Sequence, residues 1–165
     1  MSSRDEQLVA LFRGKLQELH SRTVAALQQL GDEDVNWRPN EESNSIVNLA
    51  VHLAGNLQQR MEAGIAGGAD RRDRDAEFNE RKWHARDEVL AILDGSLAMT
   101  DRVLQELGPG GLDAVQRIRN RETTVLEVLL TVTHHVAEHI GQMLYIAKLR
   151  LGPAYRVVSI PHRKV

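Results

Sequence analysis

The chain has 165 residues, of which 42% are hydrophobic, 27% charged and 4% aromatic, and it contains no cysteine. This length predicts a single domain that buries its own core. The 21 Lys and Arg residues and 23 Asp and Glu residues give a net charge of −2, whereas nucleic-acid binding normally goes with a basic excess. The lack of Cys excludes disulfides, thiolate zinc sites and iron–sulfur clusters, so any metal must be held by nitrogen and oxygen atoms.

The distribution of apolar residues bears on the location of the protein. No apolar run approaches the roughly 20 residues that span a bilayer. The polar N-terminal residues lack the apolar core of a secretion signal. We therefore expect no membrane partner and a cytoplasmic location.

Four amphipathic segments predict four helices, because apolar residues recur in them at spacings of three and four, and each is followed by a stop signal. The segments are residues 4–30, a second beginning near Ser43 or Ser45 and ending before glycines 64–68, a third over 86–107, and a fourth from Thr123 or Thr124 to about Leu151. Gly55 and Gly141 fall inside two of them, where each costs about 1 kcal/mol, so we expect them to permit close helix contacts.

The segments between the helices show no convincing strand pattern. Residues 31–42 are polar and predict a loop, and short extended pieces are possible only at 117–122 and 156–160. Four helices of this length predict an all-α fold, a four-helix bundle within a single domain 1–165. A long connection over about 66–85 and a C-terminal tail from 152 complete the expected organisation.

The long connection contains the most charged stretch of the chain, from Asp70 to Phe78. A charge run of this kind is usually a solvated loop. The connection nevertheless exceeds the roughly 2–8 residues typical of bundle connections, and long ordered loops are often functional. If it folds over an opening, Asp75 and Glu77 are candidates for acid–base roles.

Histidines are the main candidates for chemistry. His135 and His139 are four residues apart on the fourth predicted helix, so they share a face and can share a metal. A helical wheel places both on the apolar side of that helix, whereas His134 and Glu138 lie on its charged side. Imidazoles on an apolar face need polar partners or a metal, because unpaired buried polar groups are costly.

The second predicted helix supplies a third imidazole. His52 lies on the flank of its apolar stripe, with Asn56 one turn further along. Inward-facing side chains of a bundle converge, so His52 with the His135 and His139 pair predicts a three-nitrogen metal site that keeps an open position. The alternative for all three is a structural histidine without a metal. Asn56 is a candidate either to orient a ligand or to bond the backbone.

Two segments that contain these histidines resemble the signature motifs of the DinB-like superfamily of small four-helix proteins. They are residues 51–57, Val-His-Leu-Ala-Gly-Asn-Leu, and residues 135–142, His-Val-Ala-Glu-His-Ile-Gly-Gln. The likeness extends to residues 72–78, 145–148 and 159–161, and it points to a branch of unknown function.

The resemblance implies a metal triad of His52, His135 and His139. It also implies nickel or zinc as the ion, a homodimer, and an activity among the transferases and isomerases that use a low-molecular-weight thiol. One departure is that the family often has a further histidine just before the last ligand, where this chain has Glu138.

Two functions are consistent with these features. The first is a metal-dependent enzyme acting on a small molecule, in which the ion lowers the pKa of a bound water or an incoming thiol. Glu138, Asp75 and Glu77 are its candidate general bases, without a choice among them. The second is a non-enzymatic module that binds a small molecule or a partner and retains a structural metal. A nucleic-acid role ranks third, because the basic residues are interspersed with acids.

Overall fold

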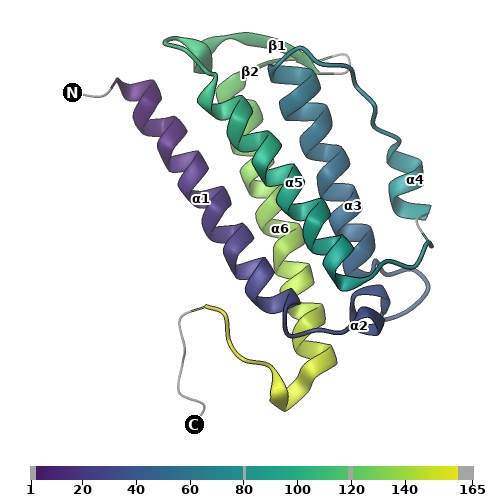
Figure 1. Cartoon of the computed structure of the whole chain (residues 1–165). Coiled ribbons are helices and arrows are strands. Elements are labelled where there is room, and N and C mark those ends of the chain that lie inside the picture. Colours follow the sequence, from purple (N-terminus) through teal and green to yellow (C-terminus); the bar gives the residue numbers. More distant parts are fainter. Residues whose placement is uncertain (1–2, 80, 119–120, 160–165) are drawn as a thin grey trace.

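A computed structural model describes residues 3–79, 81–118 and 121–159. Four long helical segments lie side by side around one apolar core (Figure 1). They are α1 (Arg4–Leu27), α3 (Ile46–Leu57) continued by the π-helix η1 (Gln58–Ile65), α5 (Arg86–Gln105) and α6 (Val125–Leu151). The described chain is therefore mostly helical, as its periodicity predicts.

Capping residues explain where these helices begin and end. The side-chain oxygens of Ser3, Ser45 and Thr124 each accept a hydrogen bond from the backbone N–H three residues later, which satisfies an N–H that has no partner within the helix. Helix α6 ends at Gly152, whose φ of 51° favours glycine. In η1 the backbone bonds span five residues, as from the N–H of Ala66 to the carbonyl of Met61 (3.0 Å).

The connections contain short elements that the sequence analysis did not predict. Helix α2 (Asp32–Asn36) lies in the predicted loop 31–42, and helix α4 (Arg74–Asn79) lies in the long connection. Single turns of 3-10 helix occupy Gly111–Asp113 and Gly152–Ala154.

The fold also contains a small sheet, so the all-α expectation holds only for its helical part. Strands β1 (Val115–Ile118) and β2 (Arg121–Thr124) pair antiparallel, with Val115 opposite Thr124. The extended piece expected at 117–122 therefore belongs to a hairpin. Residues 156–159 form no strand, and Ile160 lies outside the described residues.

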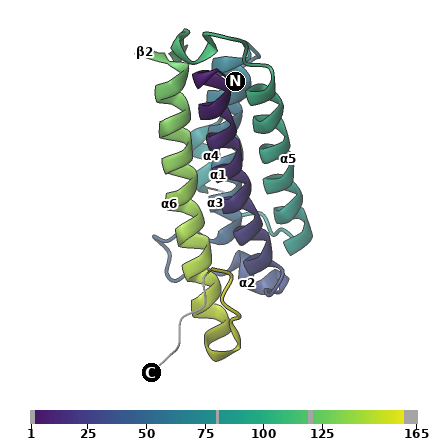
Figure 2. The same ribbon diagram turned by 90° about the vertical axis from the view of Figure 1, so that its left-hand side faces the viewer.

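The shared apolar core sets the position of α3 relative to α6. Leu27, Leu49, Leu104 and Leu129 come from the four long segments in turn, and all are fully buried. Burying a leucine side chain contributes about 1.5–3 kcal/mol, so the shared core holds the helix axes in place. Figure 2 shows that α6 extends past the end of α1, where the chain turns back. None of the helices in the described part of the chain is long and apolar enough to cross a membrane.

Candidate metal centre

His52 of α3 and His135 and His139 of α6 lie close together. One nitrogen of each ring lies within 4.8 Å of the others, and the three ring centroids are between 4.4 and 5.1 Å apart. The Nε2 atoms of His52 and His135, 83 residues apart in the chain, are separated by 3.0 Å. His134 lies on the other side of α6 with 74% of its side chain exposed.

This arrangement fits one divalent cation. A metal such as zinc binds imidazole nitrogens at about 2.0–2.1 Å, and a tetrahedral angle then separates two ligand nitrogens by about 3.3 Å. The separation between His52 and His135 is close to that value. Three imidazoles leave at least one coordination position for a water or a substrate, which is typical of catalytic sites.

The protonation of the rings also suits a metal. The pKa of His135 falls to about 4, chiefly because the ring is buried, and because the charges of its two neighbouring histidines and of Arg60 and Arg72 disfavour its protonation. Burial also lowers the pKa of His52. Both rings are therefore neutral near pH 7, and a neutral imidazole is the form that binds metals.

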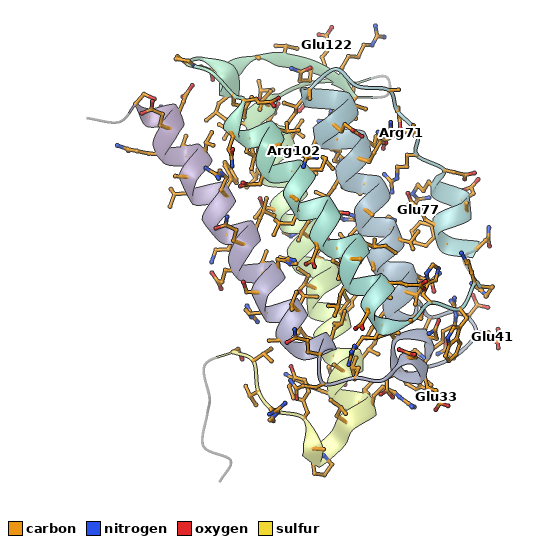
Figure 3. All side chains as sticks on the ribbon, in the orientation of Figure 1. Glu33, Glu41, Arg71, Glu77, Arg102 and Glu122 are labelled. Carbon is orange, nitrogen blue, oxygen red and sulfur yellow. The ribbon has the colours of Figure 1, made fainter. Side chains whose placement is uncertain are left out.

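A buried carboxylate orients His52. Glu77 Oε2 lies 2.8 Å from His52 Nδ1, and the two side chains are 5% and 6% exposed. The Nδ1–H donates to the carboxylate, which leaves the lone pair of Nε2 for a cation. A histidine ligand held in this way by a carboxylate is a common feature of metal sites. Glu77, a residue of α4, is thus buried against α3 (Figure 3), and His52 and Arg72 engage both of its carboxylate oxygens.

Glu77 is held in turn by Arg72. The Nε and Nη2 atoms of Arg72 donate to the two carboxylate oxygens over 2.8 and 2.9 Å, and the Arg72 side chain is 3% exposed. Its Nη1 donates to Gln59 Oε1 (3.0 Å), and Gln59 Nε2 donates to Asp70 Oδ2 (2.8 Å). We call residues 70–79 the strap. Arg72 and Glu77 attach it to η1 and α3, while most of its other residues are exposed to solvent.

Gly55 provides the space for this carboxylate. A Cβ atom at position 55 would overlap Glu77 Oε1 and stand 2.9 Å from its Cδ. The close contact expected at Gly55 is therefore made with the strap. A Cβ at Gly141 would meet nothing within 4 Å, so the expectation of a close helix contact there is wrong.

The other predicted site residues lie further from the ligand nitrogens. Glu138 is half exposed, with its oxygens 3.6 Å from His134 Nε2 and 4.0 Å from His135 Nδ1. Asp75 is exposed on the first turn of α4. Asn56 is buried one turn after His52, and its Oδ1 has no hydrogen-bond partner among the described residues.

The sequence analysis missed two residues that orient the ligands. One is Arg72, whose role depends on the path of the strap. The other is Gln142, whose Oε1 lies 3.1 Å from His139 Nδ1 and so leaves Nε2 of that ring for a metal. Its position three residues after His139 was the available signal, because side chains at this spacing meet on a helix.

The fold and the sequence are similar to those of known proteins. A crystal structure of a conserved protein from Enterococcus faecalis matches with a TM-score of 0.71 and 20% identity, over 87% of this chain and 96% of that one. At this identity the likeness shows a common fold alone. No curated protein sequence matches the chain. The family described as "Protein of unknown function (DUF1572)" matches residues 4–164, and the chain belongs to that family.

Proposed function

We propose that the chain is a divalent-metal-dependent enzyme built as a four-helix bundle of the DinB-like type. Its ion is held by His52, His135 and His139, and a small-molecule substrate takes the open coordination position. One observation carries this proposal: three imidazoles from two helices converge, and one of them is oriented by a buried carboxylate. Burying the charged side chain of Glu77 costs free energy. Its role in orienting a metal ligand explains why the side chain is buried here.

Each residue of the centre has a defined part in this proposal. When bound, the ion supplies Lewis acidity and lowers the pKa of a water or thiol beside it. Glu77 keeps the proton of His52 on Nδ1, and Gln142 does the same for His139. Burial keeps His135 neutral.

The finer features of the proposal come from ligand chemistry and from the family resemblance. Nitrogen ligands suit nickel and zinc alike, and these are the ions we propose. We propose a low-molecular-weight thiol as the nucleophile, as the family resemblance implies; a chain without cysteine must take any thiol from outside. A homodimer and a cytoplasmic location stay predictions.

A second candidate function is a non-enzymatic module that binds a small molecule or partner and keeps the ion as a structural element. The positions of the carboxylates favour it. Glu77 is engaged by Arg72 and His52, and Glu138 faces His134. Neither is placed to take a proton at the open position.

Elemental analysis of purified variants tests the centre. His52→Ala, His135→Ala and His139→Ala should each abolish metal retention, because two imidazoles are a poor site. His134→Ala is the matched control and should leave the metal content unchanged, since this ring is exposed. Equal loss in the control would contradict the proposal. Turnover of a thiol panel, with and without a chelator, then separates the enzyme from the binding module.

A further inference from the structure

A hollow of about 380 Å³ is lined by residues of α6, η1 and the hairpin. The hairpin crosses the ends of η1 and α6 (Figure 1). Arg60, Arg121 and Glu127 are its charged lining residues, and Ile118 and Leu130 are the apolar ones. Its volume is that of a small-molecule pocket.

The hollow lies about one helical turn from His135 along α6. Thr131 lines it and precedes His135 by four residues, which places Thr131 one helical turn, about 6 Å, along the same face of α6. A molecule that spans about one helical turn would therefore reach from the hollow to a cation held by His135.

The charges of the hollow favour an anion. Arg60 and Arg121 come from different elements and line the same space. The single carboxylate there, Glu127, already accepts hydrogen bonds from the Thr124 backbone N–H (2.8 Å) and from two threonine hydroxyls. The two arginines against this one carboxylate still leave the hollow with an excess of positive charge. A bound divalent ion adds further positive charge, because its three imidazole ligands are neutral.

The far side of the centre has the opposite character. A second hollow there is lined by Glu42, Glu138 and Tyr145, so its charged side chains repel anions. An anionic group would therefore favour the hairpin side. Guanidinium groups bind carboxylate and phosphate oxygens in pairs, while Ile118 and Leu130 offer apolar contact to the carbon atoms in between.

We propose that the substrate is a small organic anion, whose carboxylate or phosphate group binds between Arg60 and Arg121 while its reactive group reaches the metal. This inference rests on the proposed metal centre and adds a substrate class to it. Arg60 and Arg121 are binding residues in this proposal.

Cobalt-loaded full-length protein and a matched set of thiols provide the test. The probes are mercaptopropionate and mercaptohexanoate, compared with mercaptopropanol and mercaptohexanol, which have a hydroxyl in place of the carboxylate. Binding is followed by the thiolate-to-cobalt charge-transfer absorbance. At least one acid should bind about tenfold more tightly than its alcohol, the usual effect of a charge-assisted hydrogen bond.

Two variants and a control complete the experiment, each first checked for its cobalt content. Arg60→Gln and Arg121→Gln should reduce the preference for the acid to about twofold or less. Arg121 is exposed, so its replacement spares the core. Arg117→Gln, an exposed arginine of the same hairpin that does not line the hollow, should keep the full preference.

The outcomes distinguish this inference from the proposed function. If the alcohols bind cobalt and the acids bind no better, or if the preference survives both arginine variants, the anion site is wrong and the metal centre stands. If the wild-type chain holds no cobalt, the proposed function fails and the anion site fails with it.

Discussion

The carboxylate of Glu77 occupies the space that a side chain at position 55 would fill. Glu77 reaches His52 from a strap 25 residues further along the chain, and it does so across the bare backbone of Gly55. A glycine in the middle of a helix costs about 1 kcal/mol relative to alanine. At this position the glycine leaves room for Glu77, which orients His52 as a metal ligand.

The substitution Gly55→Ala should therefore weaken metal binding, although alanine is the better helix former. The new methyl group displaces Glu77 from His52, and losing such a partner typically costs about 10–100-fold in metal affinity. Competition with a chelator of known affinity measures the effect. Gly95→Ala in α5 is the control, because its Cβ would meet nothing within 4 Å. Wild-type affinity in Gly55→Ala would show that the contact has no role in the centre.

Variants of the Glu77–Arg72 pair should affect the free energy of unfolding and the metal affinity differently. Glu77→Gln leaves the charge of Arg72 buried without its counterion, which costs about 3–5 kcal/mol, and metal affinity falls as well. Combining it with Arg72→Met removes the buried charge, so most of the stability should return. Metal affinity should stay low, because His52 still lacks its carboxylate.

Urea unfolding and chelator competition on the same samples follow both quantities. Asp75→Asn, an exposed change in the same short helix, is the control and should alter neither. Recovery of metal affinity in the double variant would mean that Glu77 acts only as a partner of Arg72.

The metal-free protein should lose stability on mild acidification. The pKa of His135 in the folded chain is about 4, well below the 6.5 of an unperturbed histidine. Between these values the unfolded chain binds more protons, so the free energy of unfolding falls as the pH drops from about 7 to about 4. Urea unfolding at a series of pH values measures the slope. His135→Gln should make it shallower and His134→Gln should not; an equal slope in all three proteins would contradict the burial of this ring.

Neighbouring leucines on α6 test the packing of the core. Leu129 is 1% exposed and Leu130 is 64% exposed. Leu129→Ala should destabilise the fold by about 2–5 kcal/mol, since it leaves a cavity, whereas Leu130→Ala should change the free energy of unfolding by less than about 0.5 kcal/mol. Thermal or urea unfolding of the two variants measures this difference. Similar losses in both would mean that α6 is rotated about its axis.

Local sequence signals predicted the long helices well. Their periodicity and their capping residues lie within the helices themselves, so positions such as Ser45 and Thr124 locate a helix start without knowledge of the fold. The same wheel argument put His135 and His139 on one face and His134 on another, and the structure brings the first two to His52. That these rings hold an ion stays a prediction.

The burial of side chains in the strap could not be predicted from the sequence. Its alternating charges look the same whether a side chain faces solvent or the core, and only the tertiary path shows that Arg72 and Glu77 are buried while Asp75 is exposed. Gly55 was interpreted as a helix contact for the same reason: a glycine signals a close approach but not its partner. The hairpin was predicted only as a short extended piece at 117–122, because its strands are only four residues long.

The wide turns of η1 have a consequence for how relatives of this chain can diverge. A π-helical turn contains more residues than an α-helical one and commonly marks an inserted residue. Loss of Gln58, the first residue of η1, would rotate the following side chains by about 100°, and would carry Gln59 away from Arg72 and Arg60 away from the hollow. His52 lies upstream and would keep its place. One codon gained or lost here can thus alter ligand preference within the family and leave the three histidines untouched.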